Sequence, residues 1–167
     1  MHATFIPDPV NARAFRDALG AFPTGVTVIS CVGTDGLPVG ITANSFASLS
    51  LDPPLILWSP AKASTRHAHF CAARHFSVHV LGADQAAFAA RFSRGGEGFH
   101  GLAPQSNAEA VPVLADPLVR FDCRTEALHD AGDHTIVVGR VLRVLHRAGD
   151  PLVFARGRYT GLPCPNR

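Results

Sequence analysis

The chain has 167 residues, of which 47% are hydrophobic and 17% are charged, and its net charge is +2 at pH 7. This composition excludes a disordered chain, and the small, scattered positive charge excludes a basic surface for nucleic acid. We expect a single globular domain over residues 1–167. A chain of this length can bury a hydrophobic core without disulfides or metals, and it keeps apolar surface for a partner subunit.

The N-terminal part of the chain predicts one helix that leads into a strand. Asp8 before Pro9 is typical of a helix N-cap, and the apolar residues from Phe15 to Phe22 follow helical spacing, with Gly20 near the expected end. The elements expected next are a turn at 23–25, a β-branched strand at 26–32 and a hairpin turn at 33–36.

The middle of the chain predicts strands that alternate with short helices. Ser64 and Thr65 are suited to cap a short helix that runs to about Arg74, and the Ala-rich stretch 84–92 is also helical. The Gly-, Ser- and Pro-rich stretch 93–112 predicts a mobile loop. Strands are expected at 40–51, 55–58 and 75–81.

The last third of the chain predicts three more strands. Residues 118–128 alternate, with Arg120, Asp122 and Arg124 on one face, which is typical of a half-exposed strand in an antiparallel sheet. Further strands are expected at 134–145 and 151–159. About seven strands with two or three short helices indicate a mainly β fold, a closed or partly closed antiparallel barrel.

The cysteines and the N-terminus predict a cytoplasmic protein. Cys31, Cys71, Cys123 and Cys164 form no C-x-x-C pair, and their spacing suits neither a zinc site nor a disulfide framework. Three of them lie in apolar contexts, as small core residues do in a reducing compartment. The first eight residues lack the features of a signal peptide, and no apolar run approaches the ~20 residues of a membrane span.

The stretch 40–54 carries small hydroxyl and amide side chains where a strand that only filled a core would carry Val, Ile and Leu. Small polar residues let a ligand approach the backbone and offer it short hydrogen bonds. The same residues also occur where strands merely pack closely, so the composition alone leaves both interpretations open.

Four separate strings in this chain resemble the short-chain flavin reductases. These are Pro23-Thr24-Gly25, Thr42-Ala43-Asn44-Ser45 with the following 48–54, Ala89-Ala90-Arg91-Phe92-Ser93, and Gly132-Asp133-His134-Thr135. A fifth, shorter string is Arg156-Gly157-Arg158-Tyr159. The resemblance covers most of a core from about 11 to 160, and it implies an antiparallel FMN-binding split barrel of Greek-key type that forms homodimers.

The resemblance implies where a flavin would lie. The residues expected beside its ring are Pro23, Thr24, Gly25, Thr42, Ala43, Asn44, Ser45, Ser48 and Leu49. The residues expected near its phosphate are Ser59, Lys62, Ser64 and Thr65, which precede a predicted helix start where free N–H groups favour an anion. The alternative for this turn is an ordinary capped surface turn.

Four more residues are candidates for the nucleotide site. The resemblance places Phe92 near the flavin ring or the dimer contact, although a core aromatic is as good an interpretation. It places His134 on the nicotinamide side, as the one residue with a proposed catalytic role, although most lone histidines are structural. Arg158 is suited to a dinucleotide phosphate or carboxamide and Tyr159 to stacking, with a surface arginine and an interface tyrosine as the alternatives.

The histidines do not predict a metal site. His67 and His69 diverge on a helix, while His75 and His79 stand about 13 Å apart along a strand, and neither pair has a third ligand. His79 departs from the family, which commonly has Asn there, so it is a candidate to alter packing or the flavin edge.

The sequence therefore predicts an oxidoreductase that uses NADH or NADPH to reduce FMN or FAD and supplies reduced flavin to a separate monooxygenase. The alternative is a flavin- or haem-binding split-barrel carrier or sensor without turnover. A pyridoxamine-phosphate oxidase-like enzyme would need a basic pocket, and no suitable Arg/Lys cluster is visible in the sequence.

Overall fold

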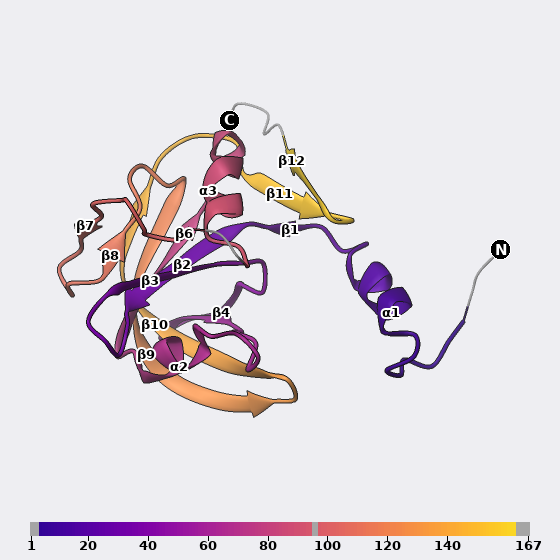
Figure 1. Cartoon of the computed structure of the whole chain (residues 1–167). Helices are drawn as coiled ribbons and strands as arrows, with labels where there is room; N and C mark the ends of the chain where they lie inside the picture. Colours follow the sequence, from indigo (N-terminus) through magenta and orange to yellow (C-terminus); the bar gives the residue numbers. More distant parts are fainter. Residues whose placement is uncertain (1–3, 95–96, 163–167) are drawn as a thin grey trace.

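The structure is a computed structural model that describes residues 4–94 and 97–162. Its main element is a seven-stranded antiparallel sheet of order β3-β2-β6-β9-β10-β5-β4, which confirms the predicted fold class (Figure 1). The strands are β2 (Thr27–Val32), β3 (Pro38–Ala43), β4 (Ala47–Leu51), β5 (Pro54–Trp58), β6 (His75–Val80), β9 (Val119–Ala131) and β10 (His134–His146).

The two edge strands of this sheet, β3 and β4, are consecutive in the chain. Only residues 44–46 separate Ala43 from Ala47. Four Cα steps span at most about 14 Å, so the sheet has to curl until its edges approach each other. The result is a barrel that is open between β3 and β4, and the predicted small-residue stretch lies at that opening.

A smaller sheet extends the barrel on one side. It has the order β1-β11-β12, with β1 (Thr24–Gly25), β11 (Leu152–Ala155) and β12 (Arg158–Gly161). Because β1 runs directly into β2, this small sheet is tied to the barrel at one corner (Figure 1). A further hairpin, β7 (Gln105–Ser106) with β8 (Pro112–Val113), lies in the stretch expected to be a loop, of which residues 95–96 are outside the described part.

The helices are short, and one of them stands away from the barrel. They are α1 (Ala12–Leu19), α2 (His67–Ala72) and α3 (Ala86–Arg91), the last preceded by the 3-10 turn η1 (Ala83–Gln85). Helix α1 has no buried residue and lies beyond β1, apart from the barrel (Figure 1). Within residues 4–94 and 97–162, no helix has the length and apolar character needed to cross a bilayer.

The first helix begins later than the sequence suggested. Its N-cap residue is Asn11, and the Asp8 carboxylate instead accepts hydrogen bonds from the N–H groups of Val10 and Asn11 at 2.8 and 2.9 Å. Asp8 therefore forms an Asx turn that leads into the helix, because its side chain bonds backbone donors two and three residues ahead.

Two clusters of buried side chains fill the fold. One centres on Trp58, Phe70 and Phe76, and the other includes Leu81 and Phe92. Cys31 and Cys123 are buried as predicted, and burial raises the pKa of each thiol to about 12. Cys71 is half-buried, and Cys164 lies outside the described residues. Apolar packing thus accounts for the two fully buried cysteines.

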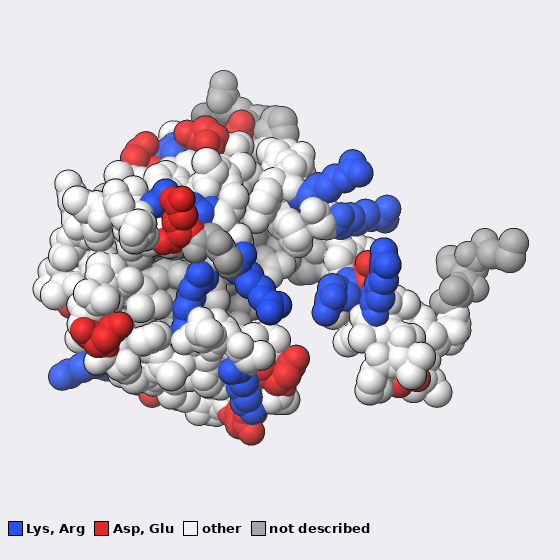
Figure 2. Space-filling model, viewed as in Figure 1, with Lys and Arg blue, Asp and Glu red and all other residues white. Residues whose placement is uncertain are grey.

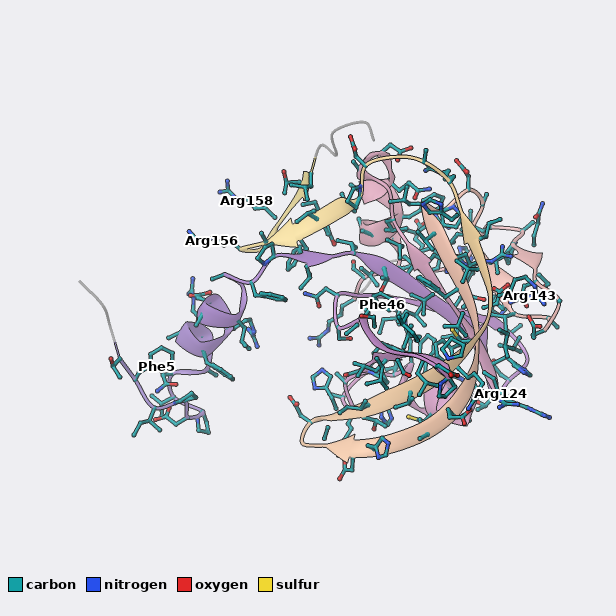
Figure 3. All side chains as sticks on the ribbon, turned by 180° about the vertical axis from the view of Figure 1, so that it is seen from behind. Phe5, Phe46, Arg124, Arg143, Arg156 and Arg158 are labelled. Atoms are coloured by element: carbon teal, nitrogen blue, oxygen red, sulfur yellow. The ribbon has the colours of Figure 1, made fainter. Side chains whose placement is uncertain are left out.

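The polar face of β9 is only partly exposed, because Glu126 is exposed whereas Asp122 is buried. Asp122 is 1% exposed, and its carboxylate accepts a hydrogen bond from Ser77 Oγ at 2.9 Å and one from Arg143 at 3.1 Å. Arg120 lies 3.1 Å from the same carboxylate, and Arg143 also reaches Glu109 beside the β7–β8 hairpin (Figure 3). The segment around β7 and β8 therefore covers this face, which strand alternation cannot reveal.

His79 is structural and does not reach a ligand edge. It is completely buried, with Nδ1 2.9 Å from the Val28 carbonyl and Nε2 accepting a hydrogen bond from the Leu114 N–H at 3.2 Å. These partners require the neutral ring with its proton on Nδ1. Burial accordingly lowers the pKa of His79 to about 4.

We expect His79 to make the protein less stable in mild acid. In the unfolded chain the imidazole binds a proton near pH 6.5, whereas in the folded protein it stays neutral down to about pH 4. The stabilisation is therefore complete above pH 6.5 and is lost as pH falls towards 4. Urea unfolding between pH 7.5 and 4 measures this loss, and His79→Gln should show a shallower pH dependence. An equally steep loss in that variant would assign the effect to other groups.

Candidate functional site

A cavity of about 120 Å³ lies at the opening of the barrel. It is lined by Thr42, Ala43 and Asn44 from the small-residue stretch and by Tyr159 from β12, together with Val26 and Phe154. The rings of Phe154 and Tyr159 lie 5.4 Å apart. The fold thus brings together two strings that were predicted separately, one for the flavin ring and one for the dinucleotide.

The residues that follow the cavity connect it to the predicted phosphate turn. Asn44 is exposed, and its amide has no hydrogen-bond partner within the described residues. Ser45 Oγ accepts a hydrogen bond from the Ser59 N–H at 3.0 Å, which joins the two predicted subsites. Leu49 lies in a β-bulge next to Ser48, and such bulges redirect side chains beside binding sites.

Two residues predicted to contact the ring make contacts within the protein, although Thr42 also lines the cavity. The Thr42 hydroxyl donates to the Ala89 carbonyl at 2.7 Å, and its N–H donates to the Phe92 carbonyl at 3.0 Å. The Phe92 side chain is 0% exposed and packs on Phe99, with ring centroids 4.8 Å apart. The Phe92 side chain therefore takes the core position that the sequence left open as the alternative.

The Pro23-Thr24-Gly25 string does not line the cavity itself but lies beside it, next to the lining residues Val26 and Phe154. Thr24 and Gly25 make up β1, and they pair in register with Phe154 and Val153 of β11. Thr24 Oγ1 is buried, yet it has no hydrogen-bond partner in the described part of the chain. A buried hydroxyl without a hydrogen-bond partner lowers the stability of the folded protein, and it points to a partner that the chain itself does not supply.

The predicted phosphate turn docks on the tip of the β9–β10 hairpin. The Lys62 N–H donates to the Asp133 carbonyl at 2.8 Å, and the Lys62 ammonium contacts Asp130 and the Gly132 carbonyl. Lys62 is therefore already paired, which weakens its assignment to a phosphate. Ser64 Oγ accepts a hydrogen bond from the Arg66 N–H at 3.2 Å and so stabilises the turn before α2, but the N-cap residue of α2 is Arg66, so neither Ser64 nor Thr65 caps the helix as predicted. Thr65 is exposed with no partner within the described residues.

His134 occupies the first position of β10, where a two-residue turn sets its direction. His134 pairs with Ala131, and Gly132 between them has φ +62°, a conformation that suits glycine. The ring atom Nδ1 lies 2.7 Å from the Asp133 carboxylate. This contact lowers the pKa of Asp133 and leaves Nε2 of His134 without a partner among the described residues, so that it can meet a ligand.

Some lining residues escaped the sequence analysis. Phe154 contacts the ring cavity because β11 pairs antiparallel with β12, which places it opposite Tyr159. Arg66 donates to the Phe92 carbonyl at 2.9 Å and ties the predicted phosphate turn to α3. The strand–turn–strand pattern of residues 152–161 could have predicted that Phe154 pairs with Tyr159. No pattern in the sequence near Arg66 predicts its contact with Phe92. Within residues 4–94 and 97–162, no three His, Cys, Asp or Glu side chains gather as a metal site would require.

A flavin fits the donors at this site. Its ring needs an apolar slot with polar groups at one edge, and its phosphate needs N–H and hydroxyl donors. Phe154 and Tyr159 supply the apolar wall, Asn44 and Thr24 carry unpartnered polar groups, and Thr65 lies in the turn beyond. The curled antiparallel sheet and this arrangement define a flavin-binding split-barrel protein.

Comparison with known proteins identifies the family. A family model described as a flavin reductase-like domain matches residues 19–163. The chain is 57% identical over 155 residues to the FMN reductase (NADH) SmoA of Agrobacterium fabrum, covering 93% of this chain and 88% of that protein. It is 41% identical over 157 residues to HsaB of Rhodococcus jostii, a reductase subunit of a flavin-dependent monooxygenase, covering 93% and 80%. The chain belongs to the flavin reductase family, and the predicted oxidoreductase is confirmed.

A solved structure shows the same fold. The NADH:FAD oxidoreductase SgcE6 of Streptomyces globisporus, in complex with NAD and FAD fragments, matches with a TM-score of 0.86 and 33% identity. The match covers 96% of this chain and 98% of that chain. The split barrel implied by the sequence is therefore confirmed as the fold.

Proposed function

We propose that this protein transfers a hydride from NADH or NADPH to FMN or FAD and supplies the reduced flavin to a separate monooxygenase. The observation that carries the proposal is the cavity at the barrel opening, where Thr42–Asn44 meet Phe154 and Tyr159. SmoA, an FMN reductase that uses NADH, is 57% identical to this chain, which favours NADH and FMN as the pair.

The chain contributes binding and orientation in this reaction. When bound, the flavin supplies the hydride-accepting ring, so neither a protein nucleophile nor a general acid is required. Asn44 and Thr24 hold the polar edge of the ring, Tyr159 packs beside it, and His134 orients the nicotinamide through its free Nε2. The Asp133 carboxylate keeps the His134 ring in position.

Steady-state oxidation of NADH and NADPH in the presence of FMN, FAD or riboflavin tests this function. We expect oxidation to depend on added flavin and to be fastest with one nicotinamide cofactor. If no combination of dinucleotide and flavin gives flavin-dependent oxidation, the proposed reaction is wrong.

We expect the predicted phosphate turn to distinguish FMN from riboflavin. Thr65→Ala removes an exposed hydroxyl without a protein partner and should weaken FMN binding about fivefold, because one hydrogen bond contributes about 1 kcal/mol. Ser64→Ala should also loosen the turn, because it removes the acceptor for the Arg66 N–H. Fluorescence titration measures both affinities, and riboflavin should be unaffected by Thr65→Ala. Equal losses for the two flavins would make the turn purely structural.

We further propose that the active form is a homodimer. The ring cavity of about 120 Å³ is small against the ~300–1,000 Å³ of typical ligand sites, so one chain does not enclose a flavin. Large apolar side chains remain exposed, among them Val10 and Leu51, each 96% exposed, and Phe22, 75% exposed. A second copy covering these side chains would complete the site.

Sedimentation velocity combined with flavin titration tests the dimer. We expect a dimer at micromolar concentration and weaker flavin binding as dilution produces monomer. A stable monomer that binds flavin with undiminished affinity would contradict the proposal.

We also propose that the protein acts in the cytoplasm. Cys31, Cys71 and Cys123 are unpaired thiols in the structure, which suits a reducing compartment.

A further inference from the structure

A second cavity, of about 500 Å³, lies beside the ring cavity. It is formed between the C-terminal end of α1 and the turn that joins β11 to β12, and its lining residues are Arg16, Asp17, Gly20, Ala21, Phe154, Arg156 and Gly157. Phe154 lines both cavities, so the two are neighbours. The volume of the second cavity lies within the usual range for small-molecule sites, ~300–1,000 Å³.

The wall of this second cavity is held by the backbone. The Arg156 N–H donates to the Gly20 carbonyl at 2.9 Å, which attaches the end of α1 to the β11–β12 turn. The Arg16 carbonyl in turn accepts a hydrogen bond from the Gly20 N–H at 2.9 Å. The positions of Arg16 and Arg156 on either side of the cavity are therefore coupled.

The turn carries an arginine in an unfavourable backbone conformation. Arg156 has φ +48° and Gly157 has φ +77°, so both central residues of this two-residue hairpin turn are left-handed. Such turns favour Asn, Asp or Gly at the first position, because a long side chain adds steric strain there. An arginine at this position indicates that the guanidinium is retained for binding.

The arginines around this cavity have no partners of their own. Within the described residues, the guanidinium groups of Arg16, Arg156 and Arg158 form no hydrogen bond or ion pair, whereas Arg140 and Arg143 on the barrel are paired with carboxylates. Arg side chains gather over α1 and the β11–β12 hairpin (Figure 2). Arg156 and Arg158 project from this hairpin away from the barrel, on the side where α1 lies (Figure 3).

We propose that this arginine-lined cavity binds the pyrophosphate of a dinucleotide whose ring end lies in the adjacent cavity. A pyrophosphate carries two negative charges, and free guanidinium groups bind phosphate oxygens in pairs of hydrogen bonds. Arg16 and Arg156 bind the pyrophosphate from two sides, while Phe154 lies between the pyrophosphate and the ring end of the dinucleotide. The inference rests on the proposed function, which supplies such a ligand, NAD(P)H; the flavin phosphate is assigned to the turn at 59–65, on the side of Ser45 and Ser59.

Arg156→Asn tests the proposal because it should weaken binding of NAD⁺ without lowering the stability of the protein. Asparagine tolerates φ +48°, so the variant should unfold at the same temperature as the parent or higher. Its affinity for NAD⁺, measured by calorimetry, should nevertheless fall about fivefold to tenfold, with a weaker dependence on salt. Nicotinamide mononucleotide, which lacks the pyrophosphate, should bind both proteins nearly equally. Arg74→Asn is the matched control, since Arg74 is also exposed but lies away from the cavity.

The same variants assign the pyrophosphate to one ligand. A loss of affinity for NAD⁺ that is the same with FMN or FAD present supports the proposal. A loss of affinity for FAD, with NAD⁺ binding unchanged, would assign the cavity to the flavin and contradict it. Unchanged affinities for both NAD⁺ and FAD in Arg156→Asn and Arg16→Gln overturn the subsite, provided that flavin-dependent NADH oxidation persists. Absence of that oxidation in the parent protein instead counts against the proposed function.

Discussion

Replacing His134 with alanine is expected to slow flavin reduction by NADH about 100-fold in a single-turnover experiment, because a misplacement of about 1 Å at the reacting groups can cost that much. The turn at Gly132 and the contact with Asp133 fix the direction of the His134 ring and leave Nε2 free. Stopped-flow absorbance measures the rate, while flavin affinity should remain near the parent value. Reduction by dithionite should be unaffected, because it requires no dinucleotide site.

His129→Ala is a suitable control for this experiment. His129 is exposed on the same β9–β10 hairpin, opposite Ile136, and its removal should leave the rate with NADH unchanged. If His134→Ala is reduced by NADH at the parent rate, His134 is structural. The nicotinamide site would then have to be sought around Arg158 and Tyr159.

Replacing Asp122 with alanine is expected to destabilise the protein by about 3–5 kcal/mol, the usual cost of removing one partner from a buried ion pair. Burial by itself raises the pKa of Asp122, but hydrogen bonds from Asn107 and Ser77 and the charge of Arg120 outweigh it and hold that pKa below its ordinary value. Without the carboxylate these donors and charges lack a partner, and the cover formed by β7 and β8 loosens.

Urea unfolding at pH 7 and at a fixed protein concentration measures this loss. Asp122→Asn keeps the shape and should retain part of the stability, since an amide oxygen still accepts hydrogen bonds. Glu126→Ala removes an exposed carboxylate that pairs with Arg140, and it should change stability far less. A loss in Asp122→Ala no greater than that in Glu126→Ala would show that the buried network contributes little.

The strands were predictable because each has its own periodicity and bounding turns. The β-branched run that became β2 and the alternating run that became β9 lie close to their expected bounds. The β7–β8 hairpin was missed because two-residue strands carry no periodic signal. The start of α1 was misplaced because Asp8 bonds backbone N–H groups in a turn as well as it does at a cap.

Within the site, short-range sequence order predicted which segments meet but not how each side chain is used. The strings that contain Asn44 and Tyr159 do line one cavity. The Thr42 hydroxyl, however, bonds to the Ala89 carbonyl of α3, and the Phe92 side chain lies in the core. The docking of α3 decides both contacts, and no local pattern in the sequence predicts it.

By itself, the sequence determined the family, the strand order along the chain and the small-residue stretch that opens the barrel. Only the tertiary structure decided that Asp122 is buried, that Lys62 is already paired, and that Gly20 at the end of α1 bonds to the turn at Arg156. The physical reason is range. Backbone periodicity and turn preferences act over a few neighbouring residues, whereas burial and ion pairing depend on segments that the folded chain brings together from distant positions.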